Sequence, residues 1–153
     1  MKVDGKRLRG LRRYHGLTQS EVAAGAGLSQ SDVSEAESGK RGADTVTRVF
    51  EGIVRSTGPV RAVRLHGARM REFLESVGAS DVRVFGSASR GDARWDSDID
   101  IVATMPEGTS LFEVVSWEEQ LRRIAGGVRV DLVPRTAQAE KSIPGLTQDA
   151  VPL

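Results

Sequence analysis

Residues 84–102, which read VFGSASRGDARWDSDIDIV, constrain this chain more than any other part of it. An apolar segment ends at Gly86, and a polar segment then leads into a second apolar segment that carries Asp98 and Asp100. Because successive side chains of a strand point to opposite faces, the two aspartates should share one face, about 7 Å apart at Cα, while Ile99 enters a core. The pattern predicts two strands that meet at a polar site.

Two neighbouring carboxylates repel each other unless a cation lies between them. Mg²⁺ prefers oxygen ligands and usually takes one or two carboxylates together with substrate phosphates. Gly86 would let the backbone approach such phosphates, with the Ser87 hydroxyl and nearby amides as donors. We therefore expect a site for a divalent metal and a triphosphate. The alternative is that Asp98 and Asp100 only decorate the polar face of a half-buried strand, but aspartate is disfavoured in strands and a repeated one needs a reason.

A third carboxylate is expected at the same face. The segment 128–133 reads VRVDLV, which predicts a further strand. Asp131 is opposite in phase to the apolar residues Val130 and Leu132. This phase would deliver its carboxylate to the sheet face of the other two aspartates.

The remaining periodicity predicts two regions separated by the sequence STGP at 56–59. The first region shows short helices, of which one has Thr18 as its N-cap with Glu21 completing a capping box, and the next has Ser29 as its cap. A helix over 44–55 closes this region. The second region predicts helices at 60–77, 87–91 and 110–125 and strands at 81–85, 98–104 and 128–133.

Charge and composition narrow the choice of partner and compartment. Residues 1–60 hold 10 lysines and arginines against 7 acidic residues, whereas residues 61–153 hold 12 against 14. The positive excess of the first part suggests a polyanionic partner there. The chain has no cysteine, which fits a reducing compartment and excludes thiolate metal sites. With neither a signal peptide nor an apolar run long enough for a membrane span, we expect a cytoplasmic protein without a membrane partner.

The order Gly-Ser, Arg-Gly and Ser-Asp-Ile-Asp within 86–100 resembles the signature of the nucleotidyltransferase superfamily of the DNA polymerase beta type, and specifically its minimal branch. The resemblance implies a Mg²⁺-dependent or Mn²⁺-dependent enzyme with ATP as its substrate. It also implies roles for seven residues. The catalytic and metal-binding residues would be Asp98, Asp100 and Asp131, and the nucleotide-binding residues would be Gly86, Ser87, Arg90 and Ser97. The alternative for Arg90 is a solvated loop arginine.

The first region carries a second resemblance. Leu-Thr-Gln at 17–19, Gly-Leu-Ser-Gln at 27–30 and Glu-Ser-Gly-Lys at 37–40 are similar to the Xre/Cro-type DNA-binding domains. The resemblance implies that a third helix enters the major groove and that an ion pair between Arg12 and Glu37 braces the bundle. Bases would then be read by Gln30, Ser31 and Glu35, and phosphates would be bound by Gln19, Lys40 and Arg41. The acidic third helix opposes this approach, and the alternative is a dimerisation or partner-binding module.

Together these patterns predict two domains. An all-α helix-turn-helix bundle over 1–57 would precede an α/β minimal nucleotidyltransferase with a small mixed sheet over 60–153. Chains of this kind resemble the antitoxins of HEPN/MNT toxin–antitoxin pairs.

That resemblance implies transfer of AMP from ATP to a tyrosine of a HEPN-domain ribonuclease toxin, together with repression of the pair's operon. It also implies operator DNA as a partner, and a homo-dimer or a hetero-oligomer with the toxin. Two alternatives stay open. One is an antitoxin and repressor that acts by binding alone, and the other is a transferase acting on RNA ends or on a small molecule such as an aminoglycoside.

Overall fold

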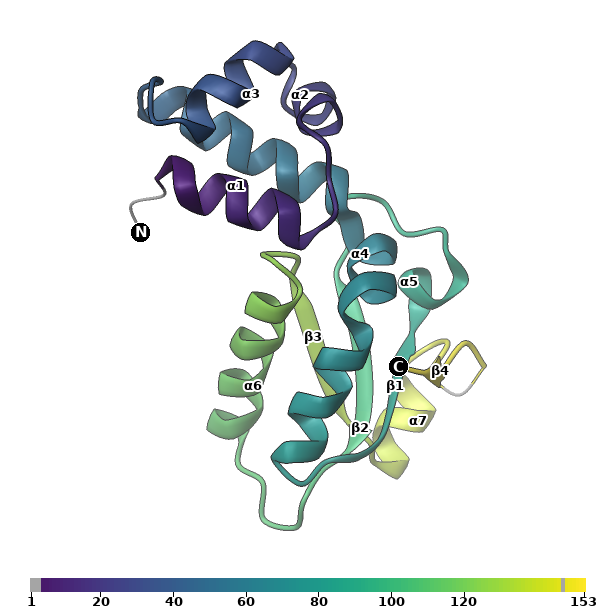
Figure 1. Ribbon diagram of the computed structural model, residues 1–153. Helices are drawn as coiled ribbons and strands as arrows, with labels where there is room; N and C mark the ends of the chain where they lie inside the picture. The colour runs from purple at the N-terminus through teal and green to yellow at the C-terminus, as the bar shows by residue number, and fades with distance from the viewer. Residues whose placement is uncertain (1–3, 147) are drawn as a thin grey trace. The chain divides into compact units, whose positions relative to one another are not determined.

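The computed structural model describes residues 4–146 and 148–153 (Figure 1). The chain divides into two compact units, residues 1–57 and 58–153. The first unit is helical, and the second is built on a sheet. Each unit is described by itself below.

Three short helices open the first unit: α1 (Gly5–Tyr14), α2 (Gln19–Ala26) and α3 (Gln30–Glu37). Each begins where a side chain satisfies a backbone N–H that has no partner within the helix. The predicted capping box of Thr18 and Glu21 is confirmed at α2, and Ser29 forms a second capping box with Asp32 at α3. Local sequence alone therefore sets where these helices start.

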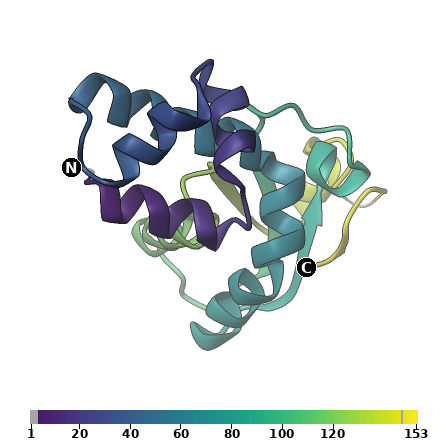
Figure 2. The same cartoon turned by 45° about the horizontal axis from the view of Figure 1, so that its top comes forward.

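The fourth helix of the sequence, α4 (Ala43–Ser76), begins in this unit. Its first part packs with α1 to α3, which are the purple and blue helices of Figures 1 and 2. The core that they enclose consists of small and branched apolar side chains, among them Leu8, Val22, Val33, Val49 and Ile53, all fully buried. Since four helices share one core, the bundle forms without a sheet.

The predicted break at 56–59 falls inside α4. The helical assignment runs from Ala43 to Ser76, but the backbone leaves helical geometry at Gly58, with φ 59° and ψ 169°. Glycine adopts this positive φ at low cost, and Pro59 removes one helical N–H directly after it. The predicted break between two helices is confirmed, because the backbone at Gly58 is not helical and separates two helical segments.

The second unit contains a sheet with the strand order β3-β2-β1-β4. Its strands are β1 (Ser80–Phe85), β2 (Ile99–Thr104), β3 (Val130–Pro134) and β4 (Val151–Pro152). β1 runs antiparallel to both β2 and β4, while β2 and β3 are parallel. The predicted α/β fold with a small mixed sheet is confirmed.

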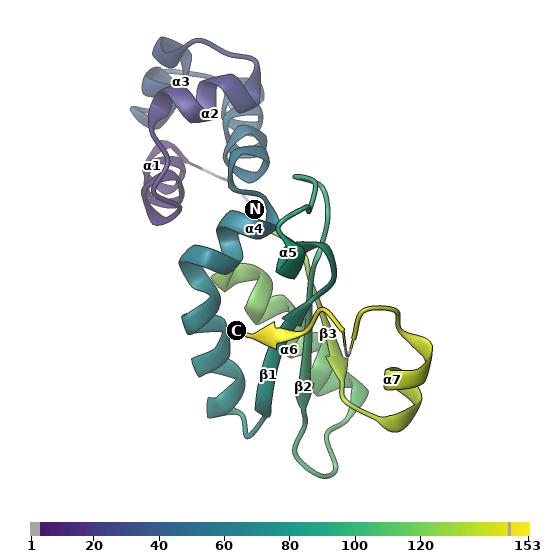
Figure 3. The same ribbon diagram turned by 90° about the vertical axis from the view of Figure 1, so that its right-hand side faces the viewer.

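The two faces of the sheet are covered differently. The second half of α4 and helix α6 (Leu111–Ile124) cover one face, where residues such as Ile101 and Leu132 are buried. Figure 3 shows helix α7 (Ala137–Ser142) on the opposite side of the strands from α4. There Phe85, Val102 and Leu146 form a smaller apolar cluster. Only part of this second face is covered by apolar packing.

The structure departs from the sequence prediction in several places. α7 and β4 were not predicted, because α7 has no buried residue and β4 has only two residues. β2 begins at Ile99, so that Asp98 precedes the strand rather than starting it. β3 spans Val130–Pro134 instead of 128–133. Among the residues described, no helix is both long and apolar enough to cross a membrane.

Candidate active site

Asp100 and Asp131 lie at paired positions of adjacent parallel strands. Asp100 of β2 is the register partner of Asp131 of β3, and on its other side it is the partner of Phe85 of β1. Paired residues of neighbouring strands project from the same face at about 4.8 Å strand spacing. Ile99 and Ile101, on either side of Asp100, are fully buried on the opposite face. The predicted alternation therefore places these two carboxylates together.

The electrostatics of Asp100 report how closely the carboxylates approach. Burial, together with the negative charges of Asp131 and Asp98, raises the pKa of Asp100 from 3.8 to about 6. Asp98, although it precedes β2, is thus near enough to add to the repulsion. Three carboxylates crowd one point of the sheet face, and a cation placed there would relieve their repulsion.

Gly86 lies directly against this cluster. It begins helix α5 (Gly86–Arg90), where its φ is +70°, and a Cβ built on it would lie 2.8 Å from Oδ2 of Asp100. Both the backbone conformation and the close approach therefore require glycine. Ser87, the next residue of α5, is partly buried. The predicted turn from β1 into α5 thus borders the carboxylates.

Arg90 and Ser97 make other contacts. Arg90 at the end of α5 pairs with Asp149 at 2.6 Å and with Asp92 at 3.3 Å, and the hydrogen bonds that it donates to these carboxylates raise its pKa. The Ser97 hydroxyl accepts a hydrogen bond from the Arg94 backbone N–H at 3.1 Å. Arg90 would have to share or leave these carboxylates to bind a phosphate, whereas the Ser97 hydroxyl accepts in its contact and keeps its O–H as a donor.

Sequence analysis missed a cation at the site, Arg129. Its Nε lies 2.8 Å from Oδ1 of Asp98, and its Nη2 donates to the Asp96 carbonyl at 3.2 Å. Oδ1 of Asp98 is buried and accepts no hydrogen bond from any described residue, so its contact with Arg129 is an ion pair without hydrogen-bond geometry. Spacing along the chain indicated only that Arg129, two residues before Asp131, points to the same face; the pair with Asp98 depends on the alignment of β2 with β3.

A second missed residue is Glu118 of α6. Its Oε1 accepts a hydrogen bond from the backbone N–H of Leu132 at 2.9 Å. This N–H lies on the edge strand, one residue after Asp131. Glu118 thus ties β3 to α6 beside the carboxylate cluster.

The three carboxylates fit a divalent cation chemically. They offer oxygen ligands, Asp98 has a buried oxygen without a hydrogen bond, and Asp100 is crowded by negative charge. Within the described ranges, however, no set of three or more acidic, histidine or cysteine side chains is already arranged to hold a metal ion. A cation bound through the buried Oδ1 of Asp98 would compete with Arg129 for that oxygen.

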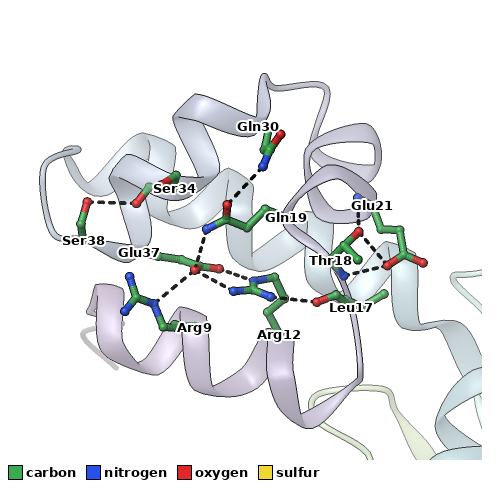
Figure 4. A network of polar contacts seen from close by, with 10 residues as sticks. All are labelled: Arg9, Arg12, Leu17, Thr18, Gln19, Glu21, Gln30, Ser34, Glu37 and Ser38. Carbon is green, nitrogen blue, oxygen red and sulfur yellow. Dashed lines mark hydrogen bonds and ion pairs between the residues drawn. The ribbon is translucent and has the colours of Figure 1, made fainter.

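The first unit holds a separate polar network around Glu37 (Figure 4). This buried carboxylate accepts hydrogen bonds from Arg12, Arg9 and Gln19. Burial alone would raise the pKa of Glu37, but the hydrogen bonds from Arg12 and Gln19 outweigh it and lower the pKa below its ordinary value. The ion pair between Arg12 and Glu37, implied by the Xre/Cro resemblance, is confirmed.

The proposed DNA-contacting residues are linked to one another. Gln30 donates to Gln19 at 3.5 Å (Figure 4). Arg41 pairs with Asp32 at 2.7 Å and with Glu35 at 3.0 Å. The Ser31 hydroxyl lies 3.4 Å from Glu35, and Lys40 is exposed. The acidic charge of α3 is thus partly neutralised by Arg41 and by the network of Glu37.

Comparison with known proteins gives a consistent result. Residues 68–150 match the family described as nucleotidyltransferase domain, and residues 5–58 match a helix-turn-helix domain. The chain is 40% identical over 70 residues to the protein adenylyltransferase MntA of Thermococcus cleftensis, covering 46% of this chain and 70% of that protein.

A solved structure described as a candidate minimal nucleotidyltransferase is 31% identical. It superposes with a TM-score of 0.52 and covers 61% of this chain and 95% of its own. The matched segment 68–150 contains β1, β2, β3 and all three aspartates. The chain therefore belongs to the nucleotidyltransferase domain family and carries a helix-turn-helix domain ahead of the transferase domain.

Proposed function

We propose that this protein is a metal-dependent nucleotidyltransferase that moves AMP from ATP to a tyrosine of a HEPN-domain ribonuclease toxin. It acts as the antitoxin of that toxin in the cytoplasm. The observation that carries the enzymatic part is the position of the partly buried Asp100 beside Asp131 and Asp98, where burial and the two neighbouring charges raise its pKa to about 6. Carboxylates that repel one another destabilise the folded state, and such groups with strongly shifted pKa values cluster at catalytic and binding sites.

In the proposed reaction the acceptor hydroxyl oxygen bonds to the α-phosphorus of ATP. The bond from this phosphorus to the β-phosphate oxygen breaks, and pyrophosphate leaves. Asp98 and Asp100 would hold Mg²⁺ or Mn²⁺, which when bound neutralises charge on the attacking and leaving oxygens. Asp131 is exposed and would accept the hydroxyl proton, while Gly86 leaves room for the nucleotide beside Asp100.

Two observations favour a protein acceptor over RNA or a small molecule. The relative in Thermococcus cleftensis is named a protein adenylyltransferase. In addition, α6 carries an exposed apolar patch of Leu111, Phe112 and Val115, whose exposed fractions are 77%, 89% and 55%. Exposed apolar side chains that gather in one place are typical of surfaces that bind other proteins. An adenylate added beside an RNA-binding site would block it through bulk and negative charge.

The helix-turn-helix domain is proposed to repress the operon of the pair. Gln30, Ser31 and Glu35 would read bases from α3, while Gln19, Lys40 and Arg41 would hold phosphates. Since one such domain contacts only a half-site, operator binding would use a dimer, either of this protein or within its complex with the toxin.

The decisive experiment is intact-mass spectrometry of the toxin. The protein is incubated with ATP, Mg²⁺ and a tenfold excess of a purified HEPN-domain ribonuclease as the candidate toxin. We expect the whole toxin pool to gain mass in units of one adenylate, and tyrosine to be the modified residue. Asp100→Asn should abolish the mass gain, while Glu119→Gln, an exposed carboxylate of α6 paired with arginines, should retain it.

Two results would reject the enzymatic proposal in favour of its alternatives. An unchanged toxin mass, with full protection by the Asp100→Asn variant at equal stoichiometry, means that the protein neutralises its partner by binding alone. Adenylation of RNA ends or of an aminoglycoside, with no labelled toxin, assigns the same chemistry to another acceptor.

A further inference from the structure

Arg129 occupies one of the oxygens that a metal at this site would need. Its Nε lies 2.8 Å from the buried Oδ1 of Asp98. The side chain of Arg129 is 67% exposed, and that of Asp98 is 30% exposed. The guanidinium therefore reaches in from the solvent side. A cation that binds Asp98 through this oxygen must compete with the arginine.

We propose that Arg129 is the resident counter-ion of Asp98, which a divalent cation must displace, so that the metal enters with the triphosphate rather than alone. This proposal rests on the transferase function proposed above. It assigns to Arg129 a positioning role and not a catalytic one, because the residue acts through Asp98.

Charge explains why the nucleotide matters. A free divalent cation that binds Asp98 displaces the Arg129 guanidinium, which then lies close to the cation without its carboxylate partner. Two positive groups a few ångströms apart repel each other. When a triphosphate arrives with the metal, its oxygens offer the released guanidinium a new partner, and arginine suits phosphate well. The free energy lost when the ion pair between Arg129 and Asp98 breaks is then offset by the new contact between Arg129 and the phosphates. Arg129 thus discriminates between the free ion and the nucleotide-bound ion.

A structural role for Arg129 makes the opposite prediction. Its Nη2 also donates to the Asp96 carbonyl at 3.2 Å and so braces the loop that leads into β2. If bracing were its only role, removing the side chain would loosen Asp98 and weaken metal binding. The sign of the change in metal affinity therefore separates the two roles.

The test is titration of Mn²⁺ alone, followed by the electron paramagnetic resonance signal of the free ion. Arg129→Gln should bind Mn²⁺ about two- to fivefold more tightly than the wild type, because a partly exposed ion pair of ordinary strength no longer competes. With ATP and metal together, the same variant should bind less tightly than the wild type. Arg129→Lys, which keeps the charge, should stay close to the wild type in the titration of Mn²⁺ alone.

Arg123→Gln is the matched control. Arg123 is also 67% exposed and is ion-paired, but with Glu119 on α6 and not with an aspartate of the cluster. Its replacement should leave both affinities unchanged. An equal effect of Arg123→Gln would show that net charge alone is being measured and would overturn the proposal.

An unchanged or weaker Mn²⁺ affinity in Arg129→Gln, including no binding at all, would also overturn it. A measurement on the wild type tests the same proposal even if the Arg129→Gln variant does not fold. Mg²⁺ added to protein with ¹⁵N-labelled arginine should shift the Nε–H resonance of Arg129 and leave that of Arg123 in place, and an unmoved Arg129 resonance at saturation rejects displacement. None of these readouts requires transfer to a partner, so a failed acceptor assay leaves them interpretable.

Discussion

A Cβ atom at position 86 would lie 2.8 Å from Oδ2 of Asp100, closer than side chains normally approach. Gly91, at the other end of α5, has a similar φ of +78° but nothing within 4 Å of such a Cβ. Replacing each glycine by alanine therefore distinguishes the effect of backbone strain, which both positions share, from the effect of a contact with Asp100, which only position 86 would make.

Gly86→Ala should abolish adenylate transfer, while Gly91→Ala should retain it. Both should lose about 1–2 kcal/mol of unfolding free energy, because alanine is strained at positive φ. Urea denaturation and the toxin mass assay measure the two effects. Equal loss of transfer in both variants would show that the approach to Asp100 is not the reason for glycine at 86.

Asp100→Asn should stabilise the fold at neutral pH. The pKa of Asp100 is raised from 3.8 to about 6, first by burial and then by Asp131 and Asp98, so the folded state binds the proton more tightly than the unfolded state. The contribution of Asp100 to stability is then fully present below about pH 4 and is lost as the pH rises through about 6.

We expect the variant to gain roughly 1 kcal/mol at pH 7, allowing for screening by solvent at a partly exposed side chain. The gain should vanish at pH 4, as measured by urea denaturation in the presence of a chelator. A gain that is independent of pH would contradict this origin.

Glu37→Ala should cost the helical unit about 3 kcal/mol or more, because it leaves Arg12 without its buried partner. The pKa of Glu37 is lowered, so its stabilising contribution is present above pH 4.5 and is lost as the pH falls below that value. Glu35→Ala, which breaks a half-exposed pair with Arg41, should cost less than about 1 kcal/mol. Chemical denaturation that gives equal costs for the two variants would exclude the central role of Glu37.

The apolar patch of Leu111, Phe112 and Val115 should carry binding of the toxin. Replacing both Leu111 and Phe112 by serine should weaken the complex at least about tenfold, since exposed aromatic anchors dominate such interfaces. Leu65→Ser on α4, where the leucine is 43% exposed, is the control and should not change affinity. Calorimetry with the purified toxin measures both, and unchanged affinity in the double variant would move the interface elsewhere.

Gln30→Ala and Lys40→Ala should affect DNA binding differently. Loss of a base contact by Gln30 should relax sequence preference by about 1–3 kcal/mol. Loss of a phosphate contact by Lys40 should weaken binding to all sequences and reduce the salt slope by about one. Fluorescence anisotropy with operator and random DNA over a salt series distinguishes the two, and absence of operator binding even with toxin present would leave only a partner-binding role.

Features that depend on residues close together in the chain could be predicted from the sequence. Features that depend on the register between strands far apart in the chain could not. The capping box at Thr18 and the N-cap at Ser29 are set within four residues, and the spacing of Asp98 and Asp100 within three. The ion pair of Arg129 with Asp98 instead depends on the parallel alignment of β2 with β3, which spacing along the chain does not specify.

The same reason explains the missed C-terminal elements. β4 exists because Val151 and Pro152 find the edge of β1, which lies about 70 residues earlier in the chain. α7 is short and has no buried residue, so it shows no apolar periodicity to detect. Neither element carries a local signal strong enough to be recognised before the sheet is known.

The hydrogen bond from Leu132 to Glu118 has a further consequence for how partners can attach. β3 is an edge strand, and an edge with open N–H groups invites another chain to extend the sheet. Glu118 occupies the N–H of Leu132 beside Asp131 and places a carboxylate where an incoming strand would need a carbonyl. Strand addition at this edge is thereby disfavoured, so a protein acceptor of the proposed reaction would reach the carboxylates through a side chain or a loop rather than by extending the sheet.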